Sequence, residues 1–244
     1  MKLNIFKTKK EAAFAAAKKA AGILNKTIAS KGYANFIAAT GVSQFELLDN
    51  LIKKFSIDWS KISMFHLDEY IGISDSHPAS FRRYLKERII DKVSLGMVYF
   101  IKGDSEDPKK ECERLGKLIK GKEIDLAFLG VGENGHIAFN EPPADFHTEK
   151  PFIIVKLDKR TRMQQLKEGW FSRLSEVPKK AISMSIKQIM KSKNIICIAY
   201  DKRKAQAVRD CFGKKISPVN PASILQKNKN AFIYLDKNSA SLIS

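Results

Sequence analysis

The sequence predicts an α/β fold with a doubly wound, mostly parallel sheet and helices on both faces. Two observations lead to this prediction. Short apolar runs rich in β-branched residues recur along the chain, and longer stretches with helical character lie between most of them. Alternation of this kind is typical of βαβ units, in which each crossover helix packs on the sheet. No linker, internal repeat or low-complexity segment divides the chain, so we expect one domain, residues 1–244.

The strands and helices follow from this alternation in chain order. The predicted strands are residues 35–39, 62–67, 98–101, 124–129, 152–157, 194–199 and 231–235. The predicted helices are residues 8–28, 43–55, 80–92, 106–120, 181–190 and 202–211. In a Rossmann-like sheet of this type, ligands bind beyond the carboxyl ends of the strands. We therefore expect the functional residues in loops that follow strands.

Composition and charge are those of a globular chain. Apolar residues make up 44% and charged residues 29%, which argues against disorder. The net charge of +18 could indicate a polyanionic partner. However, only nine of the 44 basic residues are arginine, and the lysines are scattered, as on a solvated surface. We expect no nucleic-acid partner, although a local basic site could still bind a phosphorylated metabolite.

The cysteines and the N-terminal stretch indicate a reducing compartment. Three cysteines without C-x-x-C spacing form neither a disulfide framework nor a zinc site. Lys18 and Lys19 interrupt the alanine-rich stretch near the N-terminus, which therefore does not read as a signal peptide. No apolar run approaches the roughly 18 residues of a membrane span. We expect a cytoplasmic protein with no membrane partner.

The stretch 129–146, LGVGENGHIAFNEPPADF, resembles a dinucleotide-binding turn because its glycines have the spacing G-x-G-x-x-G after a predicted strand. Such a turn requires a helix after the third glycine, Gly135, to meet the pyrophosphate. Pro142 follows too soon for that helix. Asp158 lies where a ribose-binding acid would be expected, but without the helix the fingerprint fails. The sequence therefore does not predict a nucleotide cofactor.

The same stretch places a histidine near a carboxylate. His136 precedes Glu141 by five residues on a glycine-rich loop at a strand end. A carboxylate that bonds an imidazole fixes its tautomer and raises its basicity, which yields a group able to move protons near neutral pH. A lone histidine is more often structural, so this interpretation depends on the rest of the chain.

Two adjacent acids follow another predicted strand, at Asp68 and Glu69. Successive strand residues face opposite sides, so the two cannot do the same job unless the chain has already turned. In one interpretation, one of the two carboxylates acts as a base and the other has a structural role. In the alternative, both belong to a solvated acidic turn. A metal site built from His66, Asp68 and Glu69 would need a further ligand such as His77 or His136, and no spacing selects one.

A third strand end combines a glycine with a predicted helix start. Thr40 and Gly41 precede Ser43, which with Glu46 forms the pattern of a capping box. Free N–H groups at such a place also form an anion site. Lys204 follows the predicted strand 194–199 and is well placed in the topology to complete it.

Taken together, these motifs resemble the glucosamine-6-phosphate deaminase/isomerase family. The D-E-Y and G-x-G-x-[DN]-G-H-I-A-F-N-[ED]-P motifs form a highly specific pair, and the closing P-A-S-I-L resembles the short branch labelled glucosamine- or galactosamine-6-phosphate isomerase. The matching stretches, in family order over nearly the whole chain, are ATGVSQ, HLDEYIGISDSHPASFRRYL, LGVGENGHIAFNEPPADF, VPKKAISMSI, KRKAQAV and NPASILQKNKNAFIYLDKNSASL.

The resemblance implies that an amino-sugar phosphate opens, a proton moves between C2 and C1, and ammonia leaves to give a ketohexose phosphate. It makes Asp68 the base, and His136, oriented by Glu141, the catalyst of ring opening. No redox step occurs, so no cofactor and no obligatory metal is implied. The residues that would hold the phosphate are Thr40, Gly41, Val42, Ser43 and Lys204.

Three positions depart from the pattern of the longer family members. Asn134 replaces an aspartate, and an amide can hold the histidine ring but cannot offset an imidazolium charge. Val42 replaces a second glycine, as is common in the short branch. Lys167 falls where a phosphate-binding arginine is found, while Arg162 matches the other arginine; lysine lacks the bidentate fork. These changes bear on the identity of the substrate more than on the type of reaction.

Two other functions compete with this one. A 6-phosphogluconolactonase has a related fold, but its loop resembles G-H-x-A-S-x-F-P and its acidic motif D-E-R, where Tyr70 stands here. A non-catalytic sugar-phosphate sensor would carry a DNA-binding helical segment, whereas residues 1–34 offer one helix. The choice of amino sugar and the state of any homo-oligomer stay open. We expect no allosteric control, because the chain stops soon after its last predicted strand.

Overall fold

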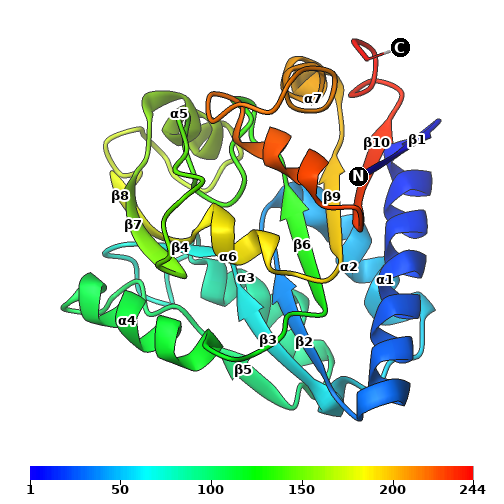
Figure 1. Cartoon of the computed structure of the whole chain (residues 1–244). Coiled ribbons are helices and arrows are strands. Elements are labelled where there is room, and N and C mark those ends of the chain that lie inside the picture. The colour runs from blue at the N-terminus through cyan, green and yellow to red at the C-terminus, as the bar shows by residue number, and fades with distance from the viewer. Residues whose placement is uncertain (244) are drawn as a thin grey trace.

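The computed structural model describes residues 1–243 and has a seven-stranded, wholly parallel sheet at its centre (Figure 1). The strand order is β1-β10-β9-β6-β2-β3-β5. This confirms the predicted fold class. The strands are β1 (Lys2–Phe6), β2 (Ala34–Ala38), β3 (Ile62–His66), β5 (Met97–Tyr99), β6 (Leu126–Gly130), β9 (Ile195–Ala199) and β10 (Ala231–Asp236).

A second, antiparallel sheet lies beside the first, at the left of Figure 1, and corrects two predictions. Its order is β4-β8-β7, with β4 at Asp68–Tyr70, β8 at Lys180–Met184 and β7 at Phe152–Lys156. The predicted strand 152–157 therefore exists but is not part of the parallel sheet. The predicted helix 181–190 is wrong in its first half, because β8 is paired on both edges. Only α6 (Ile186–Met190), capped by Ser185, is helical.

The helices pack around the main sheet, and most of them were predicted. Helix α1 begins with a capping box between Thr8 and Glu11 and ends at Gly32, and it packs against both α2 and β10. The one helix that the sequence pattern missed, α5, has a polar sequence without an apolar stripe. The remaining helices are α2 (Phe45–Lys54), α3 (Phe81–Arg88), α4 (Pro108–Ile119) and α7 (Ala205–Phe212), with α1 at Lys9–Lys31 and α5 at Lys159–Lys167.

Short 3₁₀ turns connect several of these elements. They are η1 (Val42–Gln44), η2 (Trp59–Lys61), η3 (Ile90–Lys92), η4 (Lys202–Lys204) and η5 (Pro221–Lys227). None of the helices within residues 1–243 has the length and apolar character that crossing a bilayer requires.

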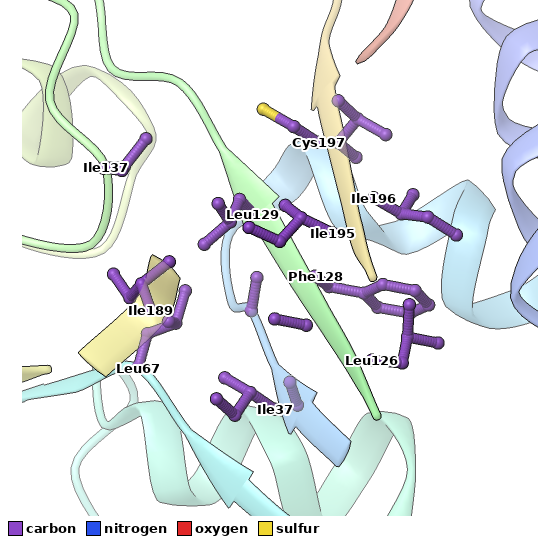
Figure 2. Close-up of a cluster of buried hydrophobic side chains, with 14 of the residues drawn as sticks. Ile37, Leu67, Leu126, Phe128, Leu129, Ile137, Ile189, Ile195, Ile196 and Cys197 are labelled. Atoms are coloured by element: carbon purple, nitrogen blue, oxygen red, sulfur yellow. The ribbon is translucent and has the colours of Figure 1, made fainter. Parts of the chain in front are cut away.

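Strand β6 shows how both faces of the main sheet are buried (Figure 2). Phe128 lies on the side of the sheet that faces α1, and Leu129, the next residue, lies on the other side. Ile137, in the loop after β6, and Ile189 of α6 lie on that same side and belong to the same buried cluster. All four side chains are buried. Both faces of β6 are therefore covered, which is why its sequence is a continuous apolar run.

The order of the strands determines where a ligand can enter. Strands β2 and β6 are neighbours, yet the chain runs outward from β2 through β3 and β5 before it returns to β6. The loops after β2 and β6 therefore leave the sheet in opposite directions and open a crevice between them. Such a switch point is where open α/β sheets bind ligands.

Candidate active site

A cleft lies above this switch point and collects residues from distant parts of the chain. It is lined by the loops that follow β2, β3, β6 and β9, and by one side of α5. Of the predicted site residues, seven line it: Thr40, Gly41, Val42, Ser43, Asp68, His136 and Lys204. Four others, namely Glu69, Asn134, Glu141 and Lys167, are not on its wall.

The loop after β2 forms an anion cradle. Gly41 has φ of +103°, a conformation that L side chains rarely adopt, and Tyr84 donates a hydrogen bond of 3.0 Å to its carbonyl. Within residues 1–243 the N–H groups of Val42 and Ser43 have no acceptor. Gln44 ties this loop to β6 through a bond of 3.3 Å to the carbonyl of Leu129. The loop therefore brings two free N–H groups to residues that line the cleft.

The predicted capping box at Ser43 is wrong. The chain passes through η1 before α2 begins at Phe45, and the residue that precedes α2 is Gln44. No side-chain hydrogen bond caps either η1 or α2. Ser43 lies one residue too early to cap α2, because the 3₁₀ turn takes up the first residues of the predicted helix. Its hydroxyl is thus not committed to the helix.

Lys204 supplies the cation of the cleft. Its side chain is 6% exposed, and among the described residues it forms no ion pair. Burial, followed by the neighbouring Arg203, lowers the pKa of Lys204 to about 8. An ammonium group that is buried without a partner is costly, so this position favours an anion brought in by a ligand.

Asp68 lies on the cleft wall at the start of β4 and is almost fully buried. Burial, and then the charge of Glu69, raises the pKa of the Asp68 carboxyl well above its ordinary value. A carboxyl group of this kind holds or releases a proton much closer to neutral pH than a surface aspartate does.

Glu69 points away from Asp68 and anchors α3. Its carboxylate accepts four hydrogen bonds: from Ser80 Oγ at 2.8 Å, and from the N–H groups of Tyr70, Phe81 and Arg82 at 3.0, 3.1 and 2.9 Å. An anion at the N-terminus of a helix is stabilised by the helix dipole. Of the two adjacent acids, one therefore faces the cleft and the other is fully buried in the fold.

His136 sits against Gly132. A Cβ atom at position 132 would overlap the imidazole ring. The Nδ1 atom of His136 lies 3.2 Å from Thr161 Oγ1 and 3.7 Å from Glu141 Oε2. The glycine spacing that resembles a nucleotide turn thus leaves room for a histidine ring, which reaches the cleft.

Asn134 lies behind His136 and joins two carboxylates. Its Nδ2 donates to Glu141 Oε2 at 2.8 Å and to Asp158 Oδ2 at 3.2 Å. Asp158 also caps α5 by accepting from the N–H of Thr161 at 2.6 Å. Sequence reasoning missed α5 and the contribution of Thr161. A signal was available, because Asp158 is a favourable N-cap residue at the start of a run without proline.

Lys167, predicted to bind the phosphate, and Arg162 both belong to α5, and neither lines the cleft. Lys167 is exposed and lines a neighbouring hollow with Lys159 and Arg160. Arg162 donates to the backbone carbonyls of residues 174 and 177. Polar residues of α5 and its C-cap line the cleft instead: Gln164, Gln165 and Glu168.

His66, considered above as a metal ligand, uses both ring nitrogens within the fold. Its Nε2 accepts from the N–H of Ile101 at 2.9 Å, so its Nδ1 carries the proton that bonds the carbonyl of Asp68 at 3.0 Å. Burial lowers the pKa of His66 to about 3. A histidine held in this way stays neutral and positions the backbone of Asp68.

Comparison with known proteins extends this description. A family model described as glucosamine-6-phosphate isomerases/6-phosphogluconolactonase matches residues 7–234. The chain belongs to this family. The resemblance seen in its motifs is thereby confirmed. The glucosamine-6-phosphate deaminase of Oenococcus oeni is 36% identical over 244 residues, which cover 100% of this chain and 99% of that protein. The deaminase of Clostridium novyi is 39% identical over 230 residues, with coverage of 92% and 94%.

Solved structures of the glucosamine-6-phosphate isomerase/6-phosphogluconolactonase family share the fold. A monomeric glucosamine-6-phosphate deaminase superposes with a TM-score of 0.92 at 31% identity and covers 99% of this chain and 100% of its own. A putative 6-phosphogluconolactonase from Neisseria gonorrhoeae has a TM-score of 0.77 at 18% identity, with coverage of 97% and 99%. The second likeness shows the fold alone.

The anchoring of α3 predicts a large cost for Glu69→Ala. Removal of the carboxylate leaves four buried donors without an acceptor, so the free energy of unfolding should fall by about 3–5 kcal/mol in urea titrations. Glu113→Ala, at an exposed position on α4, is the control and should change stability by less than about 0.5 kcal/mol. Equal, small effects of both substitutions would contradict the assigned role.

The buried cation predicts that Lys204→Met stabilises the empty protein. Below pH 8 the folded protein must bury the charge, so at pH 7 the variant should gain roughly 1–3 kcal/mol in the free energy of unfolding. Because the pKa is lowered on folding, the gain should shrink between pH 8 and the ordinary lysine pKa of 10.5. Lys202→Met, an exposed neighbour, is the matched control. A less stable Lys204→Met protein would show that the ammonium has a partner.

Proposed function

We propose that the protein is a glucosamine-6-phosphate deaminase, which converts the amino-sugar phosphate and water into the ketohexose 6-phosphate and ammonia. The observation that supports this most directly is one cleft that combines a buried acid, Asp68, with His136 and an unpaired Lys204. The named relatives are consistent with the same reaction.

The phosphate binds at the end of the cleft where the β2 loop meets Lys204. The free N–H groups of Val42 and Ser43 donate to its oxygens, and the ammonium of Lys204 neutralises its charge. Thr40 and Gly41 complete the cradle. Lys167 lies outside the cleft, so in this geometry lysine at that position does not replace a phosphate-binding arginine.

His136 opens the sugar ring. The imidazole takes the proton from the C1 hydroxyl and returns it to the ring oxygen, while the C1–O5 bond breaks and C1 becomes an aldehyde. One unprotonated ring nitrogen can do both in turn, because its lone pair accepts the proton and the N–H that results donates it. Contacts at Nδ1 from Thr161 and Glu141 leave Nε2 for the substrate.

Asp68 then moves a proton from C2 to C1 of the open chain. The carboxylate removes the C2 proton while the C1 carbonyl oxygen takes a proton from water, which gives an enolamine. Asp68 then delivers its proton to C1, and loss of one N–H proton to water leaves an imine at C2. Water adds to that imine, and the C–N bond breaks to give the ketone and ammonia. The raised pKa of Asp68 makes the carboxylate a stronger base than a surface aspartate.

We also propose a cytoplasmic location and a reaction independent of nucleic acid. The three cysteines are all free thiols, two of them buried, which suits a reducing compartment. The surface lysines are scattered over the whole chain rather than gathered on one motif.

Substrate assays test the proposed reaction. Purified protein should release ammonia from glucosamine 6-phosphate, with galactosamine 6-phosphate run in parallel to fix the sugar. A second assay with 6-phosphogluconolactone addresses the hydrolase alternative, which the family description includes. Turnover of the lactone without ammonia release from either amino-sugar phosphate would contradict the deaminase proposal.

Asp68→Asn should remove the base and keep the shape of the cleft. We expect kcat to fall by roughly 10²–10⁴-fold, because an amide cannot accept the C2 proton. Binding of the sugar phosphate, measured by calorimetry, should change little. Asp91→Asn, at an exposed position, is the control and should keep full activity. Undiminished turnover in Asp68→Asn would refute its role as base.

A further inference from the structure

Four residues, through side chains and two backbone N–H groups, join the glycine-rich loop after β6 to the start of α5 in a closed ring of hydrogen bonds. The N–H of His136 donates to Asn134 Oδ1 at 3.2 Å, and Asn134 Nδ2 donates to Asp158 Oδ2 at 3.2 Å. Asp158 Oδ1 accepts from the N–H of Thr161 at 2.6 Å, and Thr161 Oγ1 lies 3.2 Å from His136 Nδ1. The ring begins and ends on the same histidine.

We propose that Thr161 and Asp158 are positioning residues, which hold the imidazole of His136 in its working orientation through this ring. The proposal rests on the deaminase function for its kinetic consequences. Thr161 is 1% exposed and does not line the cleft, so it can act only through the histidine. Its hydroxyl is nearer to Nδ1 than the carboxylate of Glu141, at 3.2 against 3.7 Å.

The ring also explains why position 134 is an amide. One NH₂ group serves the carboxylates of Glu141 and Asp158 at once, which a carboxylate at 134 could not do. The other oxygen of Glu141, Oε1, is buried and has no partner among the described residues. Asn134→Asp would place three carboxylates together, and one of them would have to protonate or move.

The same ring couples the histidine to a wall of the cleft. Thr161 lies in the first turn of α5, and two later residues of that helix, Gln164 and Gln165, line the cleft together with its C-cap residue, Glu168. A displacement of α5 would therefore move the histidine partner and the cleft wall together. A misplacement of about 1 Å at a reacting group can cost roughly a hundredfold in rate.

Thr161→Val and Thr161→Ser test the hydroxyl. Valine keeps the shape and removes the bond to Nδ1, so kcat should fall roughly ten- to a hundredfold while KM stays within about threefold. Serine keeps the hydroxyl and should retain most of the activity. Equal activity of Thr161→Val and the unaltered protein, or equal losses in both variants, would overturn the proposal.

A measurement without substrate separates this proposal from the deaminase assignment. In ¹⁵N-labelled protein the ring-nitrogen signals report the tautomer and bonding of each histidine, and His136→Gln identifies the His136 signal. Thr161→Val should move that signal and leave those of His66, His77 and His147 in place, whereas Thr161→Ser should not move it. An unmoved His136 signal in Thr161→Val would overturn the proposal even if ammonia is released.

A double-mutant cycle tests the link between Asn134 and Asp158. Asn134→Asp alone should lower kcat at least about tenfold, because the new carboxylate then faces Asp158 across 3.2 Å and Glu141 across 2.8 Å. Asp158→Asn in the same chain replaces one of these two carboxylate contacts by a donor opposite an acceptor and still caps α5, so the double variant should recover part of that loss. The midpoints of urea unfolding, measured without substrate, should show the same recovery. Additive losses in the double variant would show that the two residues do not act as a pair.

Discussion

The parallel pairing of β2 with β6 is the contact on which the whole cleft depends. Only two pairs of residues form it, Phe36 with Leu126 and Ile37 with Ala127. It brings the anion loop and the histidine loop to one edge of the sheet, although some 90 residues of chain separate them in sequence. The bond from Gln44 to the carbonyl of Leu129 holds the two loops together just beyond the strands.

Burial gives the cleft its chemistry. The same loss of solvent raises the pKa of Asp68 and lowers that of Lys204, so each group lies closer to its neutral form than it would on the surface. Neither has a counter-ion of its own among residues 1–243. The strongly positive net charge of the chain plays little part here, because only Arg203 and Lys204, of its 44 basic residues, line the cleft.

The sequence predicted the central sheet well, because strands buried on both faces read as continuous apolar runs. It missed β1, whose residues are largely exposed at a sheet edge, and it placed a helix over β8, where a strand is followed at once by α6. Helix α5 escaped notice because its buried residues are polar, Thr161 and Gln165, and so leave no hydrophobic period.

For the site, the motifs identified residues of the cleft. They did not show which of these residues line the cleft and which support the fold around it. Alternation along a strand indicated that Asp68 and Glu69 differ, and the contacts of Glu69 assign it to the fold. The positions of Asn134 and Lys167 could not be derived from spacing, since both depend on where α5 packs. Asp158, which was rejected as a nucleotide ligand, accepts a hydrogen bond from Asn134, the residue that departs most from the family pattern.

The burial of Lys204 has a thermodynamic consequence for ligand binding. A phosphate group that settles beside the ammonium favours its protonated form and raises a pKa that stands at about 8 in the empty protein. Near that pH, occupation of the cleft takes up protons from the buffer. The heat of binding will accordingly include the ionisation enthalpy of whichever buffer supplies them.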